Sequence, residues 1–188
     1  MRVISRLVVA GSVLAAAGCS APSGIGRLAD PSPSAAAAPA KSPAVLNAAC
    51  PVLGAAELRG ELSDPSAYDA VEAPAQNGTY SKYYRCEYRR AGTTTAVAEL
   101  TVGIAKIAVP ADEIAFAERS CTAAGAVSIP GVGDGAMTCR DSYGNTVVVV
   151  VKISHGQTRV AFLGIVEHPA DPDPHSFESL AQLMAQRL

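Results

Sequence analysis

Cysteine is the residue type whose number and spacing say most about the chemistry of this sequence, which has five cysteines among 188 residues. Four of them lack Cys-x-x-Cys spacing and a histidine at ligand distance, which disfavours a zinc site: Cys50, Cys86, Cys121 and Cys139. In an oxidising compartment, four cysteines form two disulfides, with three possible connectivities. We predict the sequence-local pairs, Cys50–Cys86 and Cys121–Cys139, which leave Cys19 over.

The densest group of potential metal ligands lies between residues 168 and 175: His168, Asp171, Asp173 and His175. Two imidazoles and two carboxylates can chelate a divalent ion if the chain folds back on itself. The prolines between them hold the segment extended, which works against convergence on one ion. We therefore expect a linker in which Asp173 caps the last helix, and no metal site.

Other catalytic patterns are weak. The sequence has no Gly-x-Ser-x-Gly or Ser-x-x-Lys motif, so we predict no serine hydrolase. Asp134 lies in a glycine-rich segment whose amides could cradle an anion, but its carboxylate would repel phosphate. The more economical interpretation is a turn in which glycines adopt positive φ and Asp134 bonds the amides of that turn. No enzyme activity and no cofactor are expected.

Tyrosines are concentrated in one segment, where four of the six fall within nine residues: Tyr80, Tyr83, Tyr84 and Tyr88. In a strand, alternation sends Tyr80, Tyr84, Cys86 and Tyr88 to one face and Tyr83 to the other, together with Arg85. Tyr and Arg are favoured in binding sites. Tyr83, Arg85 and Arg89 are therefore the candidate binding residues, with a plain solvated strand face as the alternative.

The N-terminus has the organisation of an export signal. Arg2 and Arg6 precede a short apolar run, 7–17, which is too short to span a membrane. The following residues, Ala16-Ala17-Gly18-Cys19, resemble the lipobox of bacterial lipoproteins, in which the cysteine sulfur receives a diacylglyceryl group. The resemblance implies cleavage before Cys19 and acylation of the new amino terminus, for example with palmitate. The alternative is an ordinary signal peptide cut nearby, with Cys19 as a free or paired thiol.

The segment after Cys19 has the composition of a tether. Of the 27 residues in 20–46, 20 are Ala, Pro, Ser or Gly. Such a segment buries too little apolar surface to offset the conformational entropy lost on ordering. A flexible chain of this length spans about 30 Å. We therefore expect three parts: a signal peptide at 1–18, a lipid-anchored disordered tether at 19–46 and a single extracytoplasmic domain at 47–188.

Hydrophobic periodicity and turn residues define the elements expected in the domain. Helices are expected at 55–62, from 110 to about 124 and from 174 onward, with strands at 79–90, 94–107, 136–140, 146–153 and 158–166. The run Val147–Val151 is apolar at every position, which predicts a central strand covered on both faces. The expected order is α-ββ-α-βββ-α, an α+β fold with an antiparallel sheet of about five strands and packed helices.

Four short motifs occur together in this domain: Cys50-Pro51 before a helix, Cys86-Glu87-Tyr88 in a strand, Gly131–Ala136, and Leu180-Ala181-Gln182-Leu183 in the last helix. In combination they resemble actinobacterial envelope lipoproteins that carry a domain of unknown function. The resemblance implies an extracytoplasmic α+β domain similar to the Mog1/PsbP-like sandwich. It implies no reaction.

Composition excludes two classes of partner or location. A net charge of −2 with no basic run argues against nucleic acid, and no segment after the signal offers the roughly 18 apolar residues of a spanning helix. We expect a secreted, monomeric, non-catalytic domain that is held by lipid on the extracytoplasmic face of the cell membrane. Its expected role is to dock an envelope protein or a cell-wall component. The alternative is a carrier that holds a small apolar or lipid ligand between sheet and helices.

Overall fold

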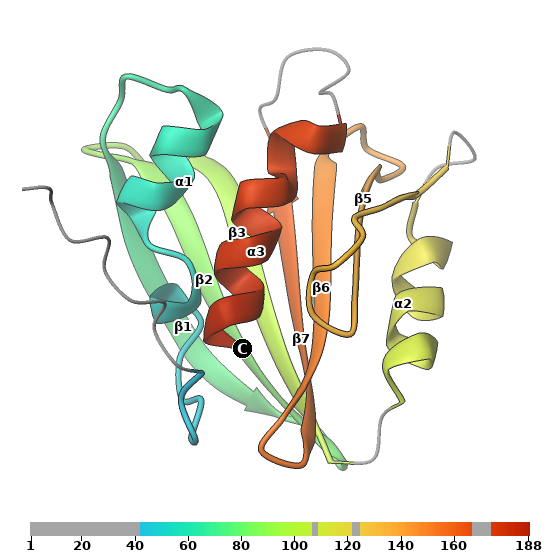
Figure 1. Cartoon of the computed structure of the whole chain (residues 1–188). Helices are drawn as coiled ribbons and strands as arrows, with labels where there is room; N and C mark the ends of the chain where they lie inside the picture. The colour runs from blue at the N-terminus through green and yellow to red at the C-terminus, as the bar shows by residue number, and fades with distance from the viewer. Residues whose placement is uncertain (1–41, 107–108, 122–124, 167–173) are drawn as a thin grey trace, which may run out of the picture. The chain divides into compact units, whose positions relative to one another are not determined.

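The computed structural model describes residues 42–106, 109–121, 125–166 and 174–188 (Figure 1). The chain divides into two units, Met1–Ala36 and Ala37–Leu188, and every described residue belongs to the second. The predicted signal peptide, Cys19 and most of the predicted tether lie outside the described residues. So do the proposed ligands of the 168–175 segment, because its backbone is described only from Pro174 and the side chain of His175 is not. Within the described ranges, no helix is long and apolar enough to cross a membrane.

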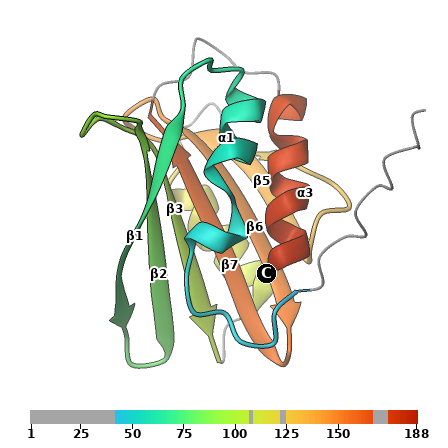
Figure 2. The same ribbon diagram turned by 90° about the vertical axis from the view of Figure 1, so that its left-hand side faces the viewer.

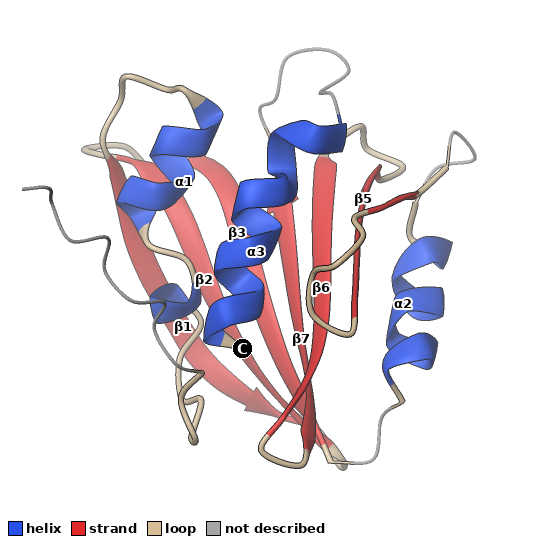
Figure 3. Ribbon diagram, in the orientation of Figure 1, coloured by secondary structure: helices blue, strands red, loops and turns tan. Residues whose placement is uncertain are grey.

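An antiparallel sheet of seven strands organises the described unit, with the strand order β1-β2-β3-β7-β6-β5-β4 (Figure 3). The strands are β1 (Tyr68–Asn77), β2 (Ser81–Arg90), β3 (Ala96–Ala105), β4 (Val127–Ser128), β5 (Gly135–Arg140), β6 (Thr146–Ser154) and β7 (Gln157–Ile165). The helical elements are η1 (Cys50–Val52), α1 (Ala55–Leu62), α2 (Pro110–Arg119), η2 (Pro174–Phe177) and α3 (Glu178–Arg187). The tight turn from β6 to β7 is built by His155 and Gly156, both with positive φ, as two-residue hairpin loops require.

Helices cover both faces of the sheet, and each face has its own apolar core. α1 and α3 pack on one face (Figure 1, Figure 2), where the larger core includes Leu100 and Leu163. α2 packs on the other face over β5 and β6, where a smaller core joins Ala117 to Met137. β6 contributes to both cores because Val147–Val151 is buried at every position, which confirms its predicted central place.

Polar contacts fix the helices on the larger core. Arg187 of α3 donates to Glu57 of α1 at 2.6 Å, and this hydrogen bond is the main reason that the pKa of Glu57 lies below its usual value. The Tyr88 hydroxyl of β2 donates to the Leu53 carbonyl at 2.6 Å, and burial raises the pKa of that hydroxyl above its usual value. The segment before α1 is thus bonded to the sheet as well as packed on it.

The two disulfides are Cys50–Cys86 and Cys121–Cys139, which confirms the predicted pairing. The first joins η1 to β2, and the second joins the chain just after α2 to β5. Glu72 of β1 lies beside the first disulfide, where its carboxylate accepts the backbone N–H groups of Ala49 and Cys50, each at 2.8 Å. Although Glu72 and the two sulfurs are close enough to resemble a metal site, the sulfurs are bonded to each other and the carboxylate is bonded to the backbone.

The α+β class is confirmed, whereas the expected count of about five strands is wrong. The observed order is η-α-βββ-α-ββββ-α, so β1 and β4 are the strands that the sequence did not indicate. β1 is exposed at most positions and contains Pro74, a residue that argues against a strand unless it lies at a sheet edge. β1 is held in place by its backbone pairing with β2 and not by burial of its side chains. β4 has only two residues, too few for any periodicity.

Two predicted boundaries are also wrong. The strand expected from residue 79 begins at Ser81, so Tyr80 lies in the preceding turn with an exposed ring instead of on the buried face. The helix expected to reach about residue 124 ends at Arg119, and Cys121 forms an isolated bridge to Asp141. Cys121 nevertheless packs against the smaller core, as the helical spacing predicted.

Candidate binding surface on the sheet

The sheet is covered unequally on its two faces. The face under α1 and α3 is packed across β2, β3, β7 and β6, whereas α2 packs mainly on β5 and β6 of the opposite face. Among the described residues, no helix lies over the α2-side surface of β1, β2 and β3 (Figure 2). We call this surface the open face. Its side chains include Val71, Tyr83, Arg85 and Glu99, all exposed.

The candidate binding residues of β2 lie on this open face. Tyr84, Cys86 and Tyr88 are buried in the larger core, and the residues between them point to the other side of the sheet, as alternation predicted. Arg89 donates to Glu87 through two hydrogen bonds of 2.8 and 2.9 Å. Arg85 lies 3.8 Å from Glu99 of β3. The structure thus brings Tyr83, Arg85 and Arg89 to one surface, but each arginine there already has a carboxylate beside it.

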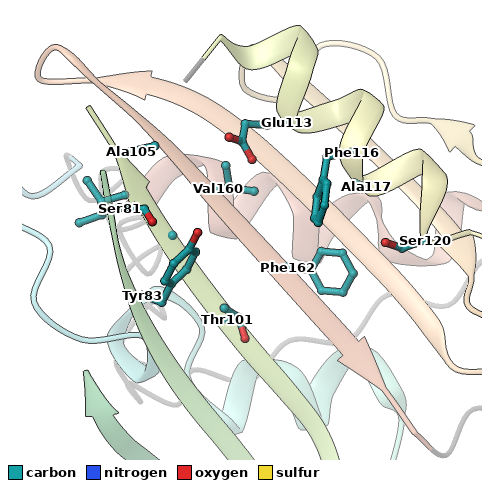
Figure 4. Close-up of a pocket in the computed structure, with 12 residues that line it drawn as sticks. Ser81, Tyr83, Thr101, Ala105, Glu113, Phe116, Ala117, Ser120, Val160 and Phe162 are labelled. Atoms are coloured by element: carbon teal, nitrogen blue, oxygen red, sulfur yellow. The ribbon is translucent and has the colours of Figure 1, made fainter. Parts of the chain in front are cut away.

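A hollow of about 310 Å³ lies where the open face meets α2 (Figure 4). Its floor is formed by Thr101 and Gly103 of β3 and by Val160 of β7. Tyr83 stands on one side, and Phe116 of α2 and Phe162 of β7 stand on the other. Glu113 of α2 is the lining residue that carries a charge. The walls are therefore mainly apolar and aromatic, the composition typical of sites for apolar ligands.

Gly103 decides how the Tyr83 ring lies. A Cβ atom at this position would stand 3.2 Å from Cε1 of that ring, closer than ordinary van der Waals contact. The absence of a side chain lets the ring lean over β3 towards the hollow, an arrangement in which an aromatic residue covers a glycine in the neighbouring strand. The Tyr83 ring thus has a structural reason for its position, and it still keeps 42% of its surface exposed.

A second hollow of about 300 Å³ continues across the open face towards β1. It shares Tyr83 and Thr101 with the first and is lined further by Arg85, Glu99 and Pro74. The register of β1 against β2 shifts between Ala73 and Gln76, and this irregularity lies beside the second hollow. The open face therefore offers an apolar end next to α2, a charged end next to β1, and Tyr83 between them.

The chain has no match among family models, curated proteins or solved structures. The resemblance of its short motifs to actinobacterial envelope lipoproteins therefore stays a prediction. The open face, its two hollows and the sequence motifs are the observations from which a function can be inferred.

Asp134 has a different role from the one expected. Gly131 and Gly133 have positive φ, as predicted for this turn. The Asp134 carboxylate, however, accepts the N–H of Ile153 on β6, and its own amide donates to the Val151 carbonyl at 2.8 Å. Asp134 therefore bonds the end of a neighbouring strand instead of the amides of its own turn. A carboxylate in this position offers nothing to an anion.

Tyr83 is the one sequence candidate that lines the first hollow; Gly103, Phe116 and Phe162, which shape it most, were not among the candidates. Phe116 lies off the stripe of Ile114 and Ala117 that packs on the smaller core, and 62% of its surface is exposed. An aromatic residue outside the buried stripe of an amphipathic helix is the signal that could have identified it. No comparable signal marks Gly103 or Phe162, because their strands are apolar on both faces in this region.

Proposed function

We propose that the protein is a lipid-anchored, extracytoplasmic, non-catalytic domain that docks an envelope partner through the open face. The observation that carries this proposal is the pair of exposed aromatic rings, Tyr83 and Phe116, on either side of an apolar hollow. Exposed aromatic residues that flank a pocket are typical of the energetically dominant positions in protein interfaces. The export signal, the lipobox-like residues and the two disulfides support the location.

The chemistry of the hollow favours a protein as the partner. Its volume is at the low end for ligand pockets, and an apolar side chain inserted from a partner would fill much of it. A glycan would bring many hydroxyl groups that need hydrogen-bond partners, and the part of the hollow formed by Val160, Phe116 and Phe162 supplies none. The Arg85–Glu99 pair at the other end of the open face can contribute polar contacts at the rim.

A carrier function is the second candidate, and the same hollow favours it. Between the sheet and the α1/α3 layer, the space is filled by buried side chains such as Tyr88, Leu100 and Met184. A bound apolar ligand would therefore lie on the α2 side, between Phe116 and Tyr83. The hollow is open to solvent along the open face, which suits a partner side chain better than a ligand that must be shielded during transport.

The docking proposal is tested by photocrosslinking in the native envelope. A photoreactive phenylalanine analogue at position 83 or 116 of the full chain is expected to give one discrete protein adduct. The matched control is the same analogue at Tyr143, which is highly exposed but lies in the turn between β5 and β6. Equal adducts from position 143, or none from 83 and 116, would contradict docking at this surface. An adduct of lipid mass would favour the carrier.

The anchor is tested separately by Cys19→Ser. Two acyl chains hold a protein stably on a membrane, because burial contributes about 0.8 kcal/mol per methylene group. The variant is expected to be released into the medium in folded form, with both disulfides formed. Cell fractionation and mass spectrometry of the released protein measure this. Retention of the variant in the membrane fraction at the wild-type level would show that Cys19 is not the anchor.

A further inference from the structure

One end of the sheet gathers several turns and the start of the described chain. This end contains the last residues of β1, β3 and β6 and the first residues of β2 and β7. The register pairs Ser81↔Ala105 and Ser154↔Gln157 show this. Figure 1 and Figure 2 both place the β1–β2 turn, the end of β3 and the β6–β7 turn together at the bottom of the view. We call this the hairpin end, comprising residues 42–46, 78–82, 104–106 and 153–157.

The hairpin end exposes large apolar side chains. Val45 is 76% exposed, Tyr80 is 69% exposed and Ile153 is 53% exposed. They come from three separate segments, so a single frayed loop does not account for them. Apolar and aromatic tips at one end of a domain are the groups that enter the boundary between lipid headgroups and acyl chains.

Basic side chains lie among these apolar tips. Lys82 and Lys106 line a hollow of about 510 Å³ between the N-terminal segment and the β1–β2 turn, and its lining among the described residues contains no carboxylate. The Lys82 ammonium lies 5.0 Å from the centre of the Tyr84 ring. The backbone N–H of Lys106 donates to the Tyr80 carbonyl at 3.4 Å, which keeps Lys106 next to the turn.

The carboxylates near this end are placed differently. Asp134 is engaged with the Ile153 amide. Glu113, in the first turn of α2, lines the first hollow beside Ser81 and Ala105 on the α2 side of the sheet, whereas Lys82 lies over the Tyr84 ring on the α1/α3 side. The positive side chains therefore belong to the β2–β3 side of the hairpin end, next to the N-terminal segment. The charge is local, since the whole chain carries a net charge of −2 and offers no general attraction to anionic surfaces.

The described chain begins at this same end, with Ser42. Arg159 donates to the carbonyls of Pro43 at 2.8 Å and Ala44 at 3.0 Å, and Lys152 donates to the Ser42 hydroxyl at 2.6 Å. Residues 20–41 separate Ser42 from Cys19, and their composition predicts a flexible tether of about 25 Å. A tether this short gives an effective concentration in the millimolar range, at which a weak contact between the hairpin end and lipid is populated.

We propose that the hairpin end rests on the anionic lipid surface, with Tyr80 and Val45 in the interface and Lys82 and Lys106 against lipid phosphates. The Cys19 anchor in this arrangement is part of the proposed function and depends on it. The contact of the hairpin end with lipid does not require the anchor. Since the strands run away from the hairpin end, the sheet stands upright on the membrane. The open face then looks sideways along the membrane, where a neighbouring envelope protein can reach Tyr83 and Phe116.

The test uses the mature chain without lipid, from the Cys19→Ser variant. The sequence contains no tryptophan, so Tyr80→Trp places a single reporter at the hairpin end, and Tyr143→Trp is the matched control in the β5–β6 turn. With vesicles of equal parts phosphatidylglycerol and phosphatidylcholine, the emission of Tyr80→Trp is expected to shift to the blue. The emission of Tyr143→Trp is expected to stay unchanged. Pure phosphatidylcholine vesicles are expected to give a smaller shift, because each surface lysine contributes about fivefold to partitioning onto anionic lipid.

Charge reversal distinguishes the electrostatic contribution of the two lysines from non-specific apolar binding to the vesicles. Lys82→Glu and Lys106→Glu, each in the Tyr80→Trp background, are expected to weaken the partition coefficient at least about fivefold each. Melting temperatures are expected to change little, since both side chains are exposed, although Lys82→Glu also removes the contact of the ammonium with the Tyr84 ring. Three results would each overturn the proposal. They are a partition coefficient that neither charge reversal changes, an emission shift at position 143 equal to that at position 80, and no binding to vesicles. None of these outcomes touches the Cys19 or crosslinking tests, which use lipid retention and protein adducts as readouts.

Discussion

Replacing Cys50 and Cys86 together with serine is expected to lower the free energy of unfolding by about 4 kcal/mol on the chain-entropy model. The same change at Cys121 and Cys139 is expected to cost about 3 kcal/mol. The first disulfide joins residues separated by 36 positions and the second by 18, so the first restricts the unfolded chain more. Cys86 is also fully buried, and a serine hydroxyl there would need a partner that the apolar core lacks.

Urea unfolding of the two double variants beside the wild type measures this order. Each pair is replaced as a pair, so that no free thiol is left to form a wrong disulfide. Equal losses, or a larger loss for the Cys121/Cys139 variant, would contradict the expected order. Function is expected to show the opposite order: loss of Cys121–Cys139 frees the end of α2 from β5 and thereby loosens the Phe116 side of the hollow. The yield of crosslinks from position 83 is therefore expected to fall more in the Cys121/Cys139 variant, although that variant loses less stability.

The strands that the sequence predicted well are those whose side chains are sorted by burial. In β2, Tyr84, Cys86 and Tyr88 enter the core while Tyr83 and Arg85 stay outside, so the alternation in the sequence corresponds directly to the structure. β1 has no such sorting, because it lies at the edge of the sheet and most of its residues are exposed. Its stability comes from backbone pairing with β2, and backbone hydrogen bonds leave little trace in side-chain types.

The candidate surface was predictable in part for the same reason. Tyr83 and Arg85 follow from alternation within one strand, which is local information. The hollow also needs Phe116 from α2 and Phe162 from β7, and their meeting depends on β3 pairing with β7, and not with β4, on the side away from β2. Sequence-local patterns do not specify such a crossover. Alternation puts Arg85 and Arg89 on one face together with Glu87, whereas the pairing of Arg85 with Glu99 depends on the register of β2 against β3, which only the structure supplies.

Arg159→Ala is the second substitution with a large expected effect, a loss of about 3 to 4 kcal/mol in the free energy of unfolding. Arg159 is fully buried on the α1/α3 face of β7. Its guanidinium donates to backbone oxygens of Pro43, Ala44 and Leu188, the last at 2.6 Å. Truncation would leave these oxygens without their donor and a cavity beneath them. Arg159→Met keeps the apolar stem and is expected to cost about half as much, partly because the Nε group has no hydrogen-bond partner among the described residues.

The distinctive consequence of Arg159→Met is local rather than global. With two of its hydrogen bonds gone, the N-terminal segment is expected to be cleaved earlier in limited proteolysis, between Ser42 and Leu46, while the rest of the domain resists. Lys152→Met is the matched control, because it removes one bond to Ser42 and one to the Ala185 carbonyl, at 2.6 Å each, and leaves Arg159 in place. Cleavage at the wild-type rate in Arg159→Met would mean that packing of Leu46, not the guanidinium, fixes where the chain leaves the hairpin end. In the proposed membrane arrangement, the position of this segment relates the proposed lipid anchor to the orientation of the open face, so the same variant would then be expected to keep its vesicle contact unchanged.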